Sequence, residues 1–187
     1  MKTKIDTKKL TISAIMIALA TVLSLVTIWK MPLGGSLTLF SMLPICLLSI
    51  IYGIKWGFAC SFVYALGQLA LSIAEVVSWG LTPTSLVGTI FLDYIIPFTL
   101  LGLAGLFASK GIVGNIVAIT VALFARFVCH FVSGIIIFDI WCEWSNVPLY
   151  SFCYNGTFML PELILTGIGA FFILKSGAIK KLIENYK

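Results

Sequence analysis

The sequence is short of charged residues. Only 10% of its 187 residues are charged, against 60% that are hydrophobic. Charged residues make up about a quarter of an average soluble domain, which they need for a polar surface. A chain with this composition and a mean hydropathy of +1.13 is therefore predicted to be an integral membrane protein.

Several motifs for chemistry are also missing. None of the five cysteines forms a CxxC pair and His130 is the only histidine, so we expect no metal site. The chain has no GxxxxGK[ST] phosphate-binding loop, which excludes ATP hydrolysis by that route. No serine or cysteine nucleophile motif accompanies the histidine, so we expect neither catalytic residues nor a cofactor.

The charge that is present lies mostly at the ends of apolar segments. Ten lysines lie before the first apolar segment, after the last, or in turns on the same side of the membrane as the two ends of the chain. Lys30 alone falls in an external loop. This distribution places both termini in the cytoplasm. It also explains the net charge of +5 without a nucleic-acid partner. The lysines of the two ends are Lys2, Lys4, Lys8, Lys9, Lys175, Lys180, Lys181 and Lys187.

Six apolar segments have the length that a membrane-spanning helix needs, about 20 residues. Their expected bounds lie near residues 10–29, 37–54, 56–75, 85–107, 112–138 and 149–174. Pro32 and paired glycines interrupt the chain after the first segment, which indicates an external loop. We therefore expect an all-α integral membrane protein with six transmembrane helices, forming one domain over residues 1–187.

Arg126 and His130 are the most informative residues of the fifth segment. A guanidinium at membrane depth costs at least about 2.5–3.5 kcal/mol, so it is kept where it faces a protein interior or a water-filled cavity. His130 lies four residues further on and so shares the same face of the helix. The polar residues expected at the same level of the fourth and sixth segments are Asp93, Tyr94, Tyr150 and Asn155.

Aromatic residues are predicted close to the same depth in the membrane. Trp79, Phe138, Trp141 and Trp144 fall at or near the external ends of the predicted helices. Aromatic faces attract cations, and a desolvated contact contributes about 2 kcal/mol. A pocket with an acid, an imidazole, an amide, phenols and indoles fits a flat, nitrogen-rich, cationic ligand.

Each of these residues also has a structural alternative. Asp93 and Arg126 can neutralise one another, His130 can be a satisfied interior histidine, and Asn155 can bridge helices. Tyr150 and the tryptophans can be interfacial anchors. The role of Glu162, next to Pro161, stays open, although it can satisfy backbone groups that the proline frees.

Four motifs together resemble the thiamine-specific substrate-binding subunits (ThiT/YuaJ type) of energy-coupling factor (ECF) transporters. The resemblance follows nearly the whole chain in order. It rests on Gly34-Gly35-Ser36 with Met42-Leu43-Pro44-Ile45, on Leu92-Asp93-Tyr94-Ile95, on the stretch from Arg126 to Gly134, and on the stretch from Tyr150 to Gly156.

The resemblance implies a six-helix bundle that captures thiamine at the extracellular side of a bacterial plasma membrane. It implies a transmembrane coupling subunit and two cytosolic ATPases as partners. The ligand residues that it carries over are Asp93, Tyr94, Arg126, His130, Tyr150 and Asn155. Where some members have a stacking tryptophan this chain has Phe138, so Trp141 is a candidate substitute from the loop.

Ala14 and Ala18 have the small-xxx-small spacing that lets two helix backbones approach closely. They either pack inside the bundle or dock onto another membrane subunit, and the resemblance implies the latter. Other functions stay open: binding of another vitamin or of the aminopyrimidine half of thiamine, an intramembrane enzyme that uses His130 with Asp93, or a small channel or structural bundle. The lack of internal symmetry and of a polar stripe through the membrane argues against the last of these.

Overall fold

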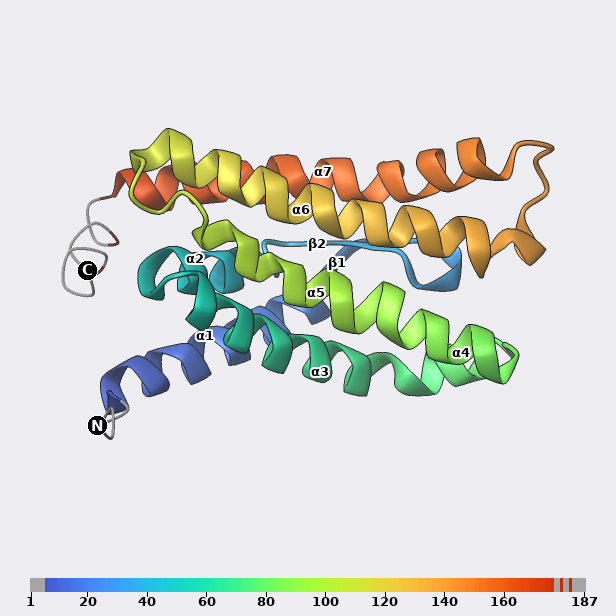
Figure 1. Ribbon diagram of the computed structural model, residues 1–187, viewed down its shortest axis with the longest axis horizontal. Coiled ribbons are helices and arrows are strands. Elements are labelled where there is room, and N and C mark those ends of the chain that lie inside the picture. Colours follow the sequence, from blue (N-terminus) through green and yellow to red (C-terminus); the bar gives the residue numbers. More distant parts are fainter. Residues whose placement is uncertain (1–5, 177–178, 180–181, 183–187) are drawn as a thin grey trace.

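The computed structural model describes residues 6–176 together with Ile179 and Leu182. Lys2, Lys4, Lys180, Lys181 and Lys187, which entered the topology prediction, lie outside them. Five helical stretches are long and apolar enough to cross a bilayer: α1 (Thr7–Leu25), α3 (Ile54–Ser78), Pro83–Gly105, α6 (Gly111–Ile136) and α7 (Val147–Lys175). The start of α1 and the end of α7 lie at the same end of the molecule, on the left of Figure 1. The prediction of a helical, multi-pass membrane protein is confirmed.

Capping side chains mark the starts of α1 and α7. Asp6 accepts a hydrogen bond from the Lys8 backbone N–H at the start of α1, and Asn146 accepts one from Leu149 at the start of α7. Such side chains satisfy backbone donors that the first turn of a helix leaves unpaired. The third, fifth and sixth predicted segments correspond closely to α3, α6 and α7.

The second predicted span, residues 37–54, is not one continuous helix. Its first residues form β2 (Ser36–Thr38), which pairs antiparallel with β1 (Thr27–Lys30) around the short 3₁₀-helix η1 (Pro32–Gly34). The helix α2 (Leu43–Tyr52) has only ten residues. It is thus about 15 Å long, half the thickness of a bilayer core.

The cause of this error is the burial of α2. All of its residues from Leu43 to Ile51 are buried, because the other helices surround it. A helix buried on every side is apolar on every side, so its sequence resembles that of a membrane span. The first helix was also predicted too long, since α1 ends at Leu25 and Trp29 belongs to β1.

The fourth span, Pro83–Gly105, changes helix type along its length. It runs through α4 (Pro83–Thr89), the π-helical turn η2 (Ile90–Ile95), α5 (Ile96–Thr99) and the 3₁₀-helix η3 (Leu100–Gly105). Pro97 has no N–H, and its ring would clash with the carbonyl of residue 93 in a regular α-helix. The wider π-turn relieves this clash, and such turns are frequent at functional sites.

Small residues allow the helices to pack closely around α2. A Cβ atom on Gly102 of η3 would lie 2.7 Å from the backbone nitrogen of Phe58 in α3, so only glycine fits there. Ser49 Oγ of α2 donates a hydrogen bond to the carbonyl of the same glycine. The outer faces of the bundle carry apolar side chains such as Ile15, Val113 and Phe172, each more than 60% exposed, as lipid contact requires.

Candidate functional site

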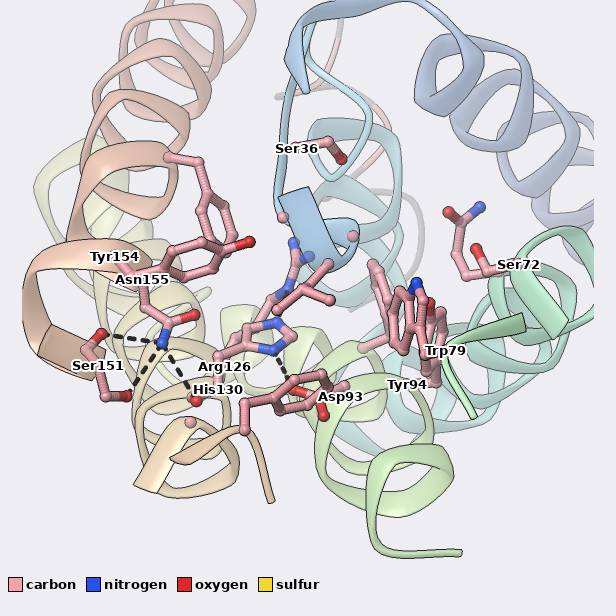
Figure 2. Close-up of a pocket in the computed structure, with 18 of the residues that line it drawn as sticks. Ser36, Ser72, Trp79, Asp93, Tyr94, Arg126, His130, Ser151, Tyr154 and Asn155 are labelled. Atoms are coloured by element: carbon pink, nitrogen blue, oxygen red, sulfur yellow. Dashed lines mark hydrogen bonds and ion pairs between the residues drawn. The ribbon is translucent and has the colours of Figure 1, made fainter. Parts of the chain in front are cut away.

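One cavity lies at the end of the bundle opposite the start of α1 and the end of α7. Including its open mouth, it has a volume of about 890 Å³. The β1–β2 hairpin, α3, the π-turn η2, α6 and the first half of α7 surround it (Figure 2). Its lining comprises Leu33, Gly34, Gly35, Ser36, Gln68, Ser72, Trp79, Asp93, Tyr94, Phe98, Arg126, His130, Gly134, Phe138, Tyr150, Ser151, Tyr154, Asn155 and Phe158.

Asp93, His130 and Arg126 form a hydrogen-bonded chain along one wall. The His130 Nδ1 atom lies 2.9 Å from Asp93 Oδ1, and Arg126 Nε donates to His130 Nε2 at 3.2 Å. Since Nε2 accepts this bond, the proton of a neutral imidazole sits on Nδ1 and is donated to Asp93. Ser133 donates a second hydrogen bond to the same carboxylate. The wall thus presents a carboxylate and a guanidinium joined by an uncharged imidazole.

The Arg126 guanidinium is held without a direct carboxylate partner. Its Nη1 atom lies 2.7 Å from the Met42 sulfur, and its central carbon lies 4.2 Å from the centroid of the Phe98 ring. Among the described residues, Lys30 forms an ion pair with Glu75, and the Asp93 carboxylate contacts the uncharged His130. Asp93 and Arg126 therefore form no direct ion pair and are joined through His130.

Asn155 joins α7 to α6 and still faces the cavity. Its Nδ2 donates to the His130 carbonyl, to the Ser151 carbonyl and to Ser151 Oγ (Figure 2). The side chain is 5% exposed. The bridging role is thus present, and the amide oxygen accepts no hydrogen bond from the residues that the structure describes.

Aromatic rings cover the two sides of the cavity mouth. On one side, the ring centroids of Trp79 and Phe138 lie 5.7 Å apart. On the other side, Tyr150 packs on Tyr154 with centroids 6.0 Å apart, and Tyr154 packs edge to face on Phe158. A flat ligand between these sides would meet ring faces and edges from both directions.

Trp141 does not take the place expected for it in the cavity wall. It stacks at a tilt behind Phe138, with centroids 5.6 Å apart, and is absent from the lining. Trp144 is also outside and packs on Tyr150. The indole at the cavity belongs instead to Trp79, at the end of α3. The position of Trp79 next to Phe138 depends on the packing of two helices that the sequence does not place side by side.

The β1–β2 hairpin covers the cavity from the third side. Tyr154 Oη donates a hydrogen bond to the Pro32 carbonyl, and Lys30 forms an exposed ion pair with Glu75 of α3 at 3.0 Å. Gly34 adopts φ +93°, and a Cβ atom there would lie 2.9 Å from the Trp79 ring. Glycine is therefore required at the hairpin tip both by its backbone and by the ring against it.

Sequence reasoning missed the α3 wall. Gln68 and Ser72 line the cavity, and Gln68 also donates to Ser24 of α1. They are spaced four residues apart and Glu75 follows three later, so all three share a face of an otherwise apolar helix. The spacing of these three polar residues could have identified this wall from the sequence. The spacing of the aromatic residues Tyr150, Tyr154 and Phe158 could likewise have identified the α7 wall.

The remaining predicted residues lie away from the cavity. Ala14 and Ala18 of α1 are both exposed, so they do not pack inside the bundle. In the described part of the chain, no group of three or more potential metal-binding side chains occurs. The predicted polar ligand residues and Phe138 thus line the cavity, whereas Trp141 does not.

Comparisons with known proteins agree with one another. The profile of the family described as "Thiamine transporter protein (Thia_YuaJ)" matches residues 10–182. The thiamine transporter ThiT of Bacillus subtilis is 32% identical over 170 residues, covering 83% of this chain and 84% of that protein. The solved structure of ThiT from Listeria monocytogenes shares the fold, with a TM-score of 0.70 and 21% identity over 94% of this chain and 96% of that one.

Proposed function

The chain belongs to the thiamine transporter protein family, and we propose that it binds thiamine as the substrate-binding subunit of an ECF transporter. The family is named for transport, so the chain is not an enzyme. Its place is the bacterial plasma membrane, where thiamine is captured from outside the cell. The observation that carries this proposal is the cavity that joins Asp93 to aromatic rings on two sides.

The chemistry of thiamine fits this lining. Its thiazolium ring carries a fixed positive charge, which a carboxylate and aromatic faces both attract. Its aminopyrimidine ring has one amino donor and ring nitrogen acceptors, which the Asn155 amide oxygen and nearby donors can pair. The proposed ligand residues are Asp93, Tyr94, Arg126, His130, Phe138, Tyr150 and Asn155, with Trp79 as the indole at the wall and Trp141 behind Phe138 as its support.

The proposed topology has both termini in the cytoplasm and six apolar segments in one domain, of which α2 is enclosed by the others. Lysines at the end of the bundle away from the cavity support this orientation. Lys9 lies over the rings of Tyr52 and Trp56 there, and Lys175 marks the end of α7. The cavity then opens toward the outside.

The proposed partners are a transmembrane coupling subunit and two cytosolic ATPases. The chain has no GxxxxGK[ST] phosphate-binding loop of its own, so the proposed ATPases would supply the ATP hydrolysis that drives import. The exposed stripe of Ala14 and Ala18 on α1 is the proposed docking face, since small side chains allow a second helix to approach closely.

Mass spectrometry of small molecules released from the purified, denatured protein tests the ligand. We expect thiamine. Release of an aminopyrimidine would make the protein a subunit for a thiamine precursor, and release of another vitamin would reassign the substrate while keeping the transport role. A protein that neither releases nor binds thiamine in titration would contradict the proposal.

The aromatic wall gives a prediction that separates Phe138 from Trp141. Phe138→Ala is expected to weaken thiamine binding about tenfold, because a ring in contact with a desolvated cation contributes about 1.4 kcal/mol or more. Trp141→Ala is expected to have a smaller effect, since its ring supports Phe138 without reaching the cavity. Quenching of tryptophan fluorescence by thiamine measures the affinity of both variants. The variant Trp79→Phe shows whether the Trp79 indole is the one that is quenched.

An equal loss of affinity in both variants would mean that the two rings act as one unit. A loss in Trp141→Ala alone would return the stacking role to the loop, as the sequence first indicated.

A further inference from the structure

The side chain of Gln68 joins the cavity to helix α1. Gln68 lines the cavity from α3, and its Nε2 atom donates a hydrogen bond to Ser24 Oγ at 3.0 Å. Ser24 Oγ in turn donates to the Thr21 carbonyl at 2.7 Å. A chain of hydrogen bonds thus runs from the α3 wall of the cavity into the backbone of α1.

This chain of hydrogen bonds determines which way the Gln68 amide is turned. The Thr21 carbonyl can only accept, so the single proton of the Ser24 hydroxyl is used in that bond. Ser24 Oγ can then only accept from Gln68, and the amide nitrogen must face it. Because Ser24 holds the nitrogen of the amide, the oxygen Oε1 points away from α1.

The Oε1 atom of Gln68 is an unused acceptor at the cavity. It accepts no hydrogen bond from the described residues, in which the amide bonds through Nε2. It is also not one of the buried polar atoms of these residues that lack a partner, so a small molecule can reach it from the cavity that Gln68 lines. An amide oxygen binds only a donor. The α3 wall therefore offers a fixed acceptor to a bound molecule.

This acceptor lies across the cavity from Asn155. Figure 2 shows Asn155 on one side of the cavity, Ser72 on the opposite side and Asp93 between them. Gln68 lies one turn before Ser72 on the same face of α3. The unpaired amide oxygens of Asn155 and Gln68 thus belong to opposite walls, and the Asp93 carboxylate lies between these walls.

Thiamine carries its polar groups in a matching order. Its aminopyrimidine and its two-carbon tail, which ends in a hydroxyl group, are attached at separate positions of the thiazolium ring, so the ring lies between them. With the aminopyrimidine at Asn155 and the ring at Asp93, the tail extends toward α3.

We propose that Gln68 determines specificity for the free hydroxyl group of the ligand, whose O–H donates to Oε1. Ser24 is a positioning residue in this scheme, because it holds the amide without touching the ligand. The inference rests on the proposed function and names the end of the ligand that the α3 wall recognises.

Titration calorimetry on the full chain in detergent tests this inference with two ligands. One is thiamine, and the other is an analogue in which hydrogen replaces the hydroxyl group of the tail. The wild type is expected to bind thiamine about tenfold more tightly, because the analogue covers Oε1 without supplying a donor. In Gln68→Leu the acceptor is gone, so thiamine binding should weaken about tenfold and binding of the analogue should change by less than about threefold.

Four further variants separate recognition of the hydroxyl group from packing. Gln68→Met, which keeps the length of the side chain, should behave as Gln68→Leu and replaces it if that variant does not fold. Gln68→Glu keeps an acceptor and should retain most of the affinity ratio of the two ligands. Phe138→Ala should weaken both ligands alike, because both contain the thiazolium ring. Ser24→Ala frees the amide to turn over, so its ratio should fall between those of the wild type and Gln68→Leu.

A wild-type ratio in both Gln68→Leu and Gln68→Met would overturn the inference. A wild-type protein that binds the two ligands equally well would overturn it too, because the hydroxyl group would then not be recognised. A full ratio in Ser24→Ala would overturn the positioning role of Ser24. A wild-type protein that binds neither ligand would instead overturn the proposed function, so the failures are distinct.

Discussion

Replacing Asp93 with asparagine is expected to weaken thiamine binding about 30-fold or more. Removing one member of a desolvated charge pair typically costs about 2–5 kcal/mol. The amide oxygen of the new side chain can still accept the hydrogen bond that His130 Nδ1 donates at 2.9 Å in the wild type. The wall of the cavity should therefore survive while its negative charge is lost. Calorimetric affinity, measured beside the melting temperature without ligand, tests this expectation.

Ser133→Ala is the matched control for Asp93→Asn. It removes the hydrogen bond from Ser133 to Asp93 and keeps the carboxylate. Its thiamine affinity should stay much closer to that of the wild type. If Asp93→Asn is stable and binds thiamine within about threefold of the wild type, Asp93 does not contact the ligand. If Asp93→Asn lowers the melting temperature strongly, the carboxylate acts mainly on folding through His130.

Tryptophan at position 14 or 18 is expected to abolish assembly with the coupling subunit. Ala14 and Ala18 are exposed on α1, and only Ser13 and Ala20 of that helix are buried. A bulky ring would hold a partner helix away from the close contact that small residues permit. Co-purification of tagged subunits measures assembly, and uptake of labelled thiamine measures the consequence, which should be close to complete loss.

Leu19→Trp is the control for this docking face. Leu19 is 46% exposed and lies about a third of a turn away from the alanine stripe, so a ring there should be tolerated. Thiamine binding by the isolated subunit should be unchanged in all three variants. Loss of binding in Ala14→Trp or Ala18→Trp without loss in Leu19→Trp would mean that the alanines support the bundle itself.

The parts of the site that the sequence predicted are those where membrane burial makes a polar residue costly. Arg126 and His130 stand out in α6 because a polar group at membrane depth needs a partner or a cavity. Asp93 and Asn155 stand out for the same reason in neighbouring helices. All four line the cavity, so the cost of desolvation alone identified most of its polar wall.

Long-range pairing explains what the sequence did not reveal. The Glu162 carboxylate accepts a hydrogen bond from the Thr38 backbone N–H, 124 residues away in sequence, and no local pattern links a glutamate after a proline to the end of a strand. The β1–β2 hairpin and α2 were hidden because one apolar run contains both a strand and a buried helix. Trp79 reached the cavity in place of Trp141 because the ends of α3 and α6 meet, which depends on helix packing.

The fourth span contains two irregularities whose effects on helical twist have opposite signs. The π-turn at Ile90–Ile95 fits one extra residue into a turn, which removes about 100° of rotation. The 3₁₀ stretch at Leu100–Gly105 turns each residue about 20° further than an α-helix, which restores about the same amount over its length. Side chains at the two ends of the span therefore point nearly as they would in one regular α-helix. Only the segment between the two irregularities, which includes Phe98, is rotated. Deleting one residue from the π-turn alone would remove the first change in rotation and keep the second. Side chains that face lipid on one side of the deletion would then turn toward the core.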